Sequence, residues 1–141
     1  MNARIQSLRD EHRLLQQQAD ELCEAARAVA ALDVEGRRAI QEHLVAFLRE
    51  RVAPHTRLDE RVLYHEVSAR LGAPLATASM NYDHVAIRSW IEDIADADPH
   101  NLGRLQQLLY GLHALITVHI WKENELYLAA LESPSWPVLA R

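Results

Sequence analysis

Only one of the 141 residues is a cysteine, Cys23. A single cysteine cannot close an internal disulfide, and it has no cysteine partner for a zinc ribbon, a c-type haem motif or a redox pair. Any metal that this chain binds must therefore be held by nitrogen and oxygen atoms.

Glycine and proline are also scarce, with four and five residues, and no segment has low complexity. No apolar run approaches the roughly 20 residues that span a bilayer, and residues 1–6 lack the hydrophobic stretch of a signal peptide. The net charge is −5, and the basic residues do not gather into a stripe that could neutralise phosphates. We therefore expect a cytoplasmic protein that binds neither a membrane nor nucleic acid.

The composition is that of a globular protein, with 49% hydrophobic and 25% charged residues, and the length suits one domain over residues 1–141. Apolar residues recur at helical spacing, which predicts four helices at about 2–30, 36–70, 76–97 and 100–132. The short connections between them make neighbouring helices antiparallel. The expected fold is all-α, an up-down-up-down four-helix bundle.

Two prolines mark local features of these helices. Asp98 followed by Pro99 is typical of an N-cap with proline at the first helical position, and so predicts the start of the fourth helix. Pro54 lies inside the second helix, where it removes one backbone hydrogen bond and should bend the chain.

Histidine is abundant, with eight residues, and each predicted helix carries one that interrupts its apolar stripe: His12, His55, His84 and His119. Two of these histidines have a carboxylate four residues later, Asp59 and Glu123, on the same helix face. At 100° per residue, each carboxylate lies within about 40° of its histidine, as do the apolar residues Val62 and Leu126. All six polar residues should therefore face the core.

The four histidines also agree in depth along the bundle to roughly 10 Å, at 1.5 Å per residue. Two carboxylates buried at that depth would cost several kcal/mol unless a cation compensated them. The pattern therefore predicts a metal site in one layer of the bundle. Of the other histidines, three are predicted at the surface and one is ambiguous, respectively His43, His100 and His113, and His65.

The ligand set indicates the class of metal. Six nitrogen and oxygen ligands exceed the needs of one tetrahedral zinc, and the set is too rich in imidazole for Mg²⁺ or Ca²⁺. Two transition-metal ions that share the carboxylates fit better. The Glu-x-x-His motif of ferritin-like sites is absent, because the residues three before the histidines are Arg9, Val52, Asn81 and Ile116.

The order of these motifs resembles the hemerythrin-like, or HHE cation-binding, family of di-iron proteins over nearly the whole chain. The segments that carry the resemblance are Glu11-His12, His55-xxx-Asp59-Glu60-xxx-Tyr64, Asp83-His84 and His119-Ile120-xx-Glu123-Asn124-xx-Tyr127. The resemblance implies two iron ions joined by an oxo or hydroxo group. It further implies four terminal iron ligands and two bridging carboxylates, respectively His12, His55, His84 and His119, and Asp59 and Glu123.

The chain departs from the family pattern at two positions. Asp59 stands where the family usually has glutamate, so either Asp59 or its neighbour Glu60 bridges the ions. Oxygen-carrying hemerythrins have another histidine at the position of Met80, whose soft thioether matches ferric iron poorly. We expect Met80 to pack beside the site and water, peroxide or a phenolate to fill the vacant coordination position. Tyr127 is one candidate phenolate, with a packed aromatic role as its alternative.

These features favour a non-haem di-iron protein that binds or reacts with O₂, hydrogen peroxide or NO at an open iron position. Peroxide decomposition, as in a catalase, or redox sensing is favoured over reversible O₂ carriage, which requires a saturated ligand shell. An iron-handling or sensing module without turnover is the alternative. A metal-free helical interaction domain, in which the polar layer only fixes the bundle register, is the third possibility.

Overall fold

A computed structural model describes residues 2–133, and these form four long helices without a strand. The first is α1 (Ala3–Ala28), extended by η1 (Val29–Ala31), and the third is α5 (Ala78–Asp96). The second joins α2 (Val34–Phe47), η2 (Leu48–Val52), α3 (Ala53–Arg61) and α4 (Leu63–Leu71). The fourth joins α6 (Leu102–Lys122), η3 (Glu123–Leu128) and α7 (Ala129–Glu132).

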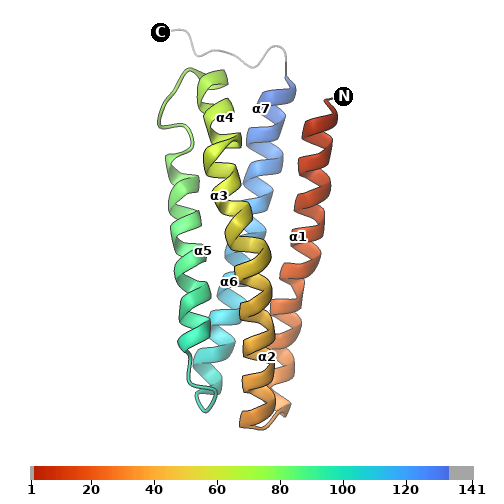
Figure 1. The fold of residues 1–141 in the computed structure, drawn as a ribbon, viewed down its shortest axis with the longest axis vertical. Helices are drawn as coiled ribbons and strands as arrows, with labels where there is room; N and C mark the ends of the chain where they lie inside the picture. Colours follow the sequence, from red (N-terminus) through yellow and green to blue (C-terminus); the bar gives the residue numbers. More distant parts are fainter. Residues whose placement is uncertain (1, 134–141) are drawn as a thin grey trace.

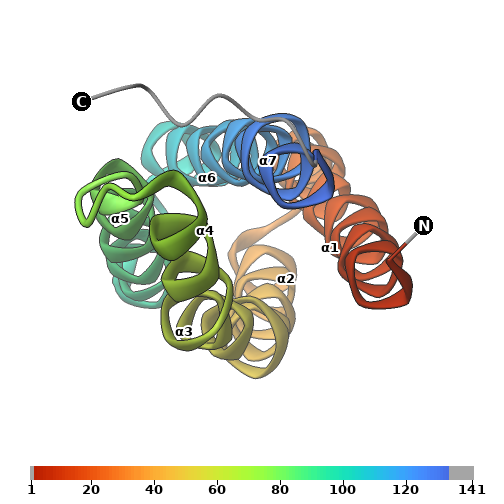
Figure 2. The same ribbon diagram turned by 90° about the horizontal axis from the view of Figure 1, so that it is seen from above.

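The four long helices run antiparallel in sequence order, as Figure 1 shows. Seen from above, they surround a common axis (Figure 2), with α6 packed between α1 and α5 and with α2 against α5. This confirms the predicted up-down-up-down four-helix bundle. Within the described residues, no helix combines the length and apolarity needed to cross a bilayer.

The fourth long helix begins two residues later than predicted, and its cap differs. Its N-cap is Asn101, whose side chain accepts a hydrogen bond from the backbone N–H of Arg104 at 3.0 Å. The Asp98 carboxylate instead accepts from the backbone N–H of His100 at 2.9 Å. The Asp98-Pro99 pair thus forms a turn before the helix, because an Asp side chain can cap a turn as well as a helix.

Pro54 lies just after a widened turn of the second long helix. In η2 the hydrogen bonds span five residues, and the N–H of Ala53 donates to the carbonyl of Leu48. A proline ring has no N–H and clashes with the carbonyl four residues earlier, so the preceding turn widens to accommodate it. The predicted distortion at Pro54 therefore takes the form of a π-helical turn.

Two apolar residues that the helical wheel places inward are exposed instead. Val62 has φ −120° and ψ −66°, which breaks the helix between α3 and α4 and turns Tyr64 inward. The π-helical η3 shifts the register of the fourth long helix, so that Leu126 is 45% exposed and Tyr127 is buried. A wheel of 100° per residue fails at both places because neither segment has α-helical geometry.

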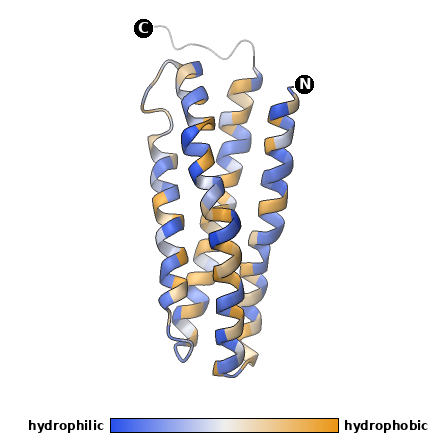
Figure 3. Ribbon diagram, in the orientation of Figure 1, coloured by the Kyte–Doolittle hydropathy of each residue, from blue (hydrophilic) through white to orange (hydrophobic). Residues whose placement is uncertain are grey.

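The core consists of two apolar clusters along the bundle axis. Hydrophobic and hydrophilic residues alternate at helical spacing in all four helices (Figure 3). The larger cluster extends toward the α5–α6 turn, and the smaller one contains Ile5, Leu63, Met80 and Leu128. In each long helix, the polar residues of the predicted metal site lie between members of the two clusters. The polar layer is therefore closed off from solvent above and below.

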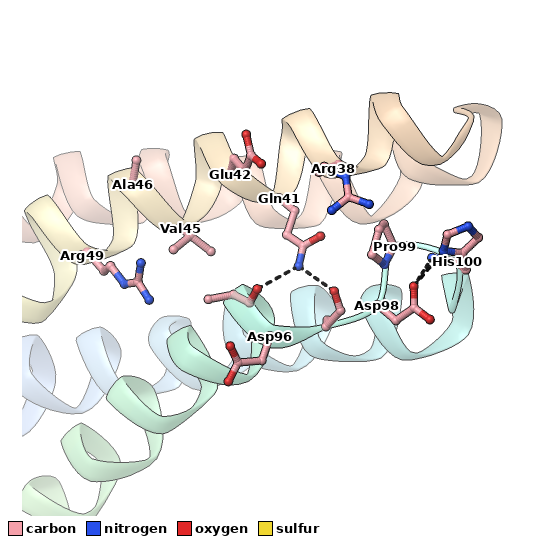
Figure 4. A pocket seen from close by; sticks show the side chains of 12 residues that line it. Arg38, Gln41, Glu42, Val45, Ala46, Arg49, Asp96, Asp98, Pro99 and His100 are labelled. Atoms are coloured by element: carbon pink, nitrogen blue, oxygen red, sulfur yellow. Dashed lines mark hydrogen bonds and ion pairs between the residues drawn. The ribbon is translucent and has the colours of Figure 1, made fainter.

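A pocket of about 620 Å³ lies at the end of the bundle where α2 begins and α5 ends (Figure 4). There, the side-chain amide of Gln41 donates to the carbonyls of Ile94 at 2.6 Å and Ala97 at 2.8 Å. Ile94 lies in the last turn of α5, where its carbonyl also accepts from the N–H of Ala97 at 3.3 Å, and Ala97 is the C-cap of this helix. Carbonyls at a helix C-terminus lack their full set of helical partners. Gln41 thus links the second long helix to the C-terminal end of the third by hydrogen bonds.

Candidate metal centre

The six predicted ligands converge on one layer from all four long helices. They are nearly buried, none more than 7% exposed, and we call them the inner cluster: His12 of α1, His55 and Asp59 of α3, His84 of α5, His119 of α6 and Glu123 of η3. Their ligand atoms form two groups, in each of which all atoms lie within 4.8 Å of one another. One group has four residues and the other three: His12, His55, Asp59 and Glu123, and His84, His119 and Glu123.

Glu123 joins the two groups because its two oxygens face different histidines. Its Oε2 lies 3.2 Å from Nε2 of His12, and its Oε1 lies 3.2 Å from Nε2 of His119. In the four-residue group, Nε2 of His55 lies 3.0 Å from Oδ2 of Asp59. In the three-residue group, the Nε2 atoms of His84 and His119 lie 2.8 Å apart. All four imidazoles therefore point the same nitrogen, Nε2, at the centre.

The other nitrogen of each imidazole, Nδ1, contacts an oxygen on a neighbouring long helix. Four residues supply these oxygens, and we call them the outer acceptors. The pairs, in bundle order, are Glu11 with His55 (3.1 Å), Glu60 with His84 (3.0 Å), Asp83 with His119 (3.1 Å) and Asn124 with His12 (2.8 Å). Each long helix thus supports the imidazole of the next, and the fourth supports the first, so the pairs form a closed ring.

The ring fixes the tautomers of the histidines. A carboxylate or an amide oxygen only accepts, so each Nδ1 must carry the proton and donate it outward. Each Nε2 of a neutral imidazole then turns a lone pair inward. Four inward atoms have no hydrogen-bond partner within the described residues: His12 Nε2, His55 Nε2, Asp59 Oδ2 and Glu123 Oε2. Buried lone pairs facing one another are unfavourable without a cation, and this arrangement fits one.

The pKa values of the inner cluster are shifted by burial and by the charges of neighbouring members. Burial, together with the charge of Glu123, raises the pKa of Asp59 to about 9. Burial and the nearby His119 lower the pKa of His84 to about 4. Although burial opposes it, the adjacent carboxylate of Glu123 raises the pKa of His12. Burial disfavours the charged form of each of these side chains. In the metal-free protein, the uptake or loss of protons therefore reduces the charge that a bound cation would otherwise balance.

Two basic side chains hold outer acceptors in place, and sequence reasoning missed both. Arg88 donates to Glu60 at 2.9 Å, and Lys122 donates to Asp83. Although burial opposes it, the contacts with Arg88 and His84 hold the pKa of Glu60 below its usual value. The pKa of Asp83 is lowered in the same way, against its burial, by Lys122 and His119. Both carboxylates are therefore ionised and able to accept from an imidazole.

Tyr64 is the further residue at the centre that sequence reasoning did not assign. Its hydroxyl donates to Oε1 of Glu123 at 2.6 Å and lies 3.0 Å from Nε2 of His84. Its ring stacks on the His84 ring, with centroids 5.2 Å apart and an interplanar angle of 16°. Burial and the charge of Glu123 raise the pKa of the Tyr64 phenol. A regular helix through Val62 would not predict this orientation.

The structure places the residues for which the sequence left alternatives open: Asp59 and Glu60, Met80, and Tyr127. Asp59 is 1% exposed and belongs to the inner cluster, whereas Glu60 is an outer acceptor. Met80 is buried in the smaller apolar cluster. The Tyr127 hydroxyl donates to the carbonyl of Ala76 at 2.8 Å, so this ring has the packed role.

The remaining histidines lie apart from the inner cluster. His43 and His100 are exposed as predicted, and so is His65, which was ambiguous. His113 is partly exposed, and its Nε2 lies 2.9 Å from a carboxylate oxygen of Asp20. None of the four belongs to a group of candidate ligands within the described chain.

A family model for the hemerythrin HHE cation-binding domain matches residues 3–131. The match contains the complete inner cluster and all four outer acceptors. No curated protein and no solved structure matches the chain significantly.

Proposed function

Because this chain belongs to the hemerythrin HHE cation-binding domain family, we propose that its inner cluster holds two iron ions, one of which binds a small molecule. The observation that carries the proposal is the division of the inner cluster into two groups that share Glu123. A carboxylate with one oxygen in each direction is suited to bridge two cations. The unpartnered inward atoms support the same conclusion.

Each group would hold one ion. In the four-residue group, the ligands are two imidazoles and Asp59, with Glu123 as the shared bridge. In the three-residue group, His84 and His119 bind the second ion together with Glu123. We propose Asp59 as a ligand of the first ion rather than as the second bridge that the family resemblance implies, since its oxygen is grouped with His12 and His55 and not with the other pair.

The donor set favours iron over the hard divalent ions, because imidazole nitrogen with carboxylate oxygen suits transition metals. A bound iron pair would supply Lewis acidity and redox equivalents. The outer acceptors orient the imidazoles and make them stronger ligands. The two apolar clusters keep bulk water away from the layer.

The three-residue group has fewer protein ligands, and this favours it as the place where a small molecule binds. The hydroxyl of Tyr64 adjoins it, 3.0 Å from Nε2 of His84, and can exchange a hydrogen bond with an incoming oxygen atom. We propose O₂, NO or hydrogen peroxide as the ligand class, with peroxide decomposition as the reaction. Two molecules of peroxide then give one O₂ and two water molecules.

The test is metal quantitation with an electronic spectrum, followed by anaerobic addition of peroxide. We expect about two equivalents of iron and near-ultraviolet and visible absorption from a coupled ferric pair. Replacement of Glu123 with Ala should abolish this absorption, whereas His43→Ala, at an exposed position, should leave it unchanged. Less than about half an equivalent of iron, zinc or manganese would contradict the proposal and favour the metal-free bundle.

The same experiment separates turnover from storage or sensing. Release of O₂ from peroxide faster than an equal amount of free iron achieves would support a catalase-like enzyme. Full iron occupancy without O₂ release would assign the chain to iron handling or sensing instead.

A further inference from the structure

We propose that a polar groove beside α4 and the start of α5 is the route by which a small hydrogen-bonding molecule, of the size and polarity of hydrogen peroxide, reaches the His84–His119 half of the centre. This inference rests on the proposed function and adds the route and polarity of the ligand. We call this cavity the entry groove.

The entry groove has a volume of about 570 Å³. Small residues of the α4–α5 connection form part of its wall, among them Gly72, Ala73 and Pro74. The residues with hydrogen-bonding side chains are Glu60, Tyr64, His65, Ser68, Thr77 and Asn81. Small residues leave room at the mouth, and the polar side chains offer both donors and acceptors.

The entry groove reaches the centre through two residues that touch His84. Tyr64 and Glu60 both line the groove. The carboxylate of Glu60 lies 3.0 Å from Nδ1 of His84, and the hydroxyl of Tyr64 lies 3.0 Å from its Nε2. Only the side chain of Tyr64 therefore separates a molecule in this part of the groove from the inward nitrogen of His84.

The half of the centre that adjoins the entry groove is the half with fewer protein ligands. His84 and His119 share only Glu123, whereas His12 and His55 have both carboxylates. A second groove of about 550 Å³ lies between α1 and α6 and is lined by His12. On both sides the outer nitrogen of the histidine is covered, by Asn124 at His12 and by Glu60 at His84, so the number of protein ligands is what distinguishes the two halves. The group with fewer protein ligands and the entry groove thus lie on the same side of the centre, that of His84.

The lining favours a polar ligand over an apolar gas. The hydroxyls of Ser68 and Thr77 are 3.4 Å apart, so their mutual hydrogen bond is long and each can bind a guest. Hydrogen peroxide has two donors and several acceptor lone pairs, and such a groove can pass it from one hydroxyl to the next. NO and O₂ gain nothing from these contacts.

The experiment measures azide binding to the iron-loaded protein by stopped-flow absorption, with azide as a small polar probe. Asn81→Trp places a large side chain at the mouth of the entry groove from an exposed helix position. Ala73→Trp does the same from the loop and is the second variant should the first not fold. Arg13→Trp, at an exposed position in the second groove, is the matched control.

We expect Asn81→Trp to slow azide association about tenfold and to slow dissociation equally, because a blocked route changes both rates and leaves the affinity unchanged. Iron content and the spectrum before azide should match those of the unmodified protein. Peroxide consumption should slow in parallel, and Arg13→Trp should change none of these quantities.

Two results would overturn the inference while leaving the proposed function intact. Full iron content with unchanged azide rates in both Asn81→Trp and Ala73→Trp would show that ligands enter elsewhere. Slower rates in Arg13→Trp alone would assign entry to the second groove. A protein without iron before any substitution would instead refute the proposed function.

Discussion

Replacement of Asp59 with Asn should raise the free energy of unfolding of the metal-free protein and lower that of the iron-loaded protein. Asp59 is 1% exposed, and its Oδ2 has no hydrogen-bond partner within the described residues. Asparagine has nearly the same shape, carries no charge, and can donate an N–H to the inward Nε2 of His55, 3.0 Å from Oδ2. The substitution therefore removes the cost of the buried carboxyl and satisfies an imidazole lone pair.

The pKa of Asp59 determines how large this difference in the free energy of unfolding should be. This pKa is about 9 in the folded protein, against the ordinary value of 3.8 for an aspartate side chain. Since the folded pKa is raised, the folded state binds the proton more tightly, and the free energy of unfolding falls as pH rises from about 4 to about 9. The interval from 3.8 to pH 7 corresponds to about 4 kcal/mol. Asn does not titrate, so its advantage should be near zero at pH 4 and up to about 4 kcal/mol at pH 7.

The assay is urea unfolding of chelator-treated protein at pH 4, 5.5 and 7, repeated at pH 7 with bound iron. With iron, the order should reverse, because Asp59 is one of the proposed ligands and its binding energy would be lost in the variant. Asp93→Asn, at an exposed position, is the control and should change the free energy of unfolding by less than about 0.5 kcal/mol. A metal-free Asp59→Asn protein that is less stable than the unmodified one at pH 7 would refute the reasoning.

Two further predictions concern the support of the centre and the packing of the bundle. Asp83→Ala should weaken iron binding roughly 10–100-fold, measured by competition with a chelator, because it removes the oxygen that accepts from Nδ1 of His119 and orients this imidazole. An unchanged affinity would show that the ring is dispensable. Gly111→Ala should lower the free energy of unfolding by about 1–3 kcal/mol in urea, because a Cβ there would lie 2.5 Å from a ring carbon of Trp90. Its iron content should stay unchanged, and a loss of iron would indicate that the damage extends to the centre.

The inner cluster was predictable from sequence because most of its members lie in regular α-helix. His12, His84 and His119 interrupt apolar stripes in α1, α5 and α6, where 100° per residue holds. His55 and Asp59 are four residues apart within α3. In each case a local rule about one helix was sufficient.

The wheel failed where the backbone leaves α-helical geometry. The break at Val62 and the π-helical η3 exchange an expected apolar residue for an aromatic one, Tyr64 in the first case and Tyr127 in the second. No residue between Glu123 and Leu128 is a proline or glycine, so the local sequence does not predict the widened turn. A π-helical turn at that position places Glu123 and Asn124 beside the imidazoles, and such turns are frequent at functional sites.

The ring of outer acceptors has a sequence signature that depends on the topology. Each acceptor directly adjoins an inner residue but contacts an imidazole of a different long helix. The acceptor comes first in the first and third helices and second in the second and fourth, in the order Glu11-His12, Asp59-Glu60, Asp83-His84 and Glu123-Asn124. A one-residue step turns about 100° around a helix, and its sense, viewed from one end of the bundle, reverses when the helix runs the other way. A step back in a descending helix and a step forward in an ascending one therefore point the same way around the bundle axis. This alternation is what closes the ring, and it requires the antiparallel order of the helices before any single pair can be interpreted.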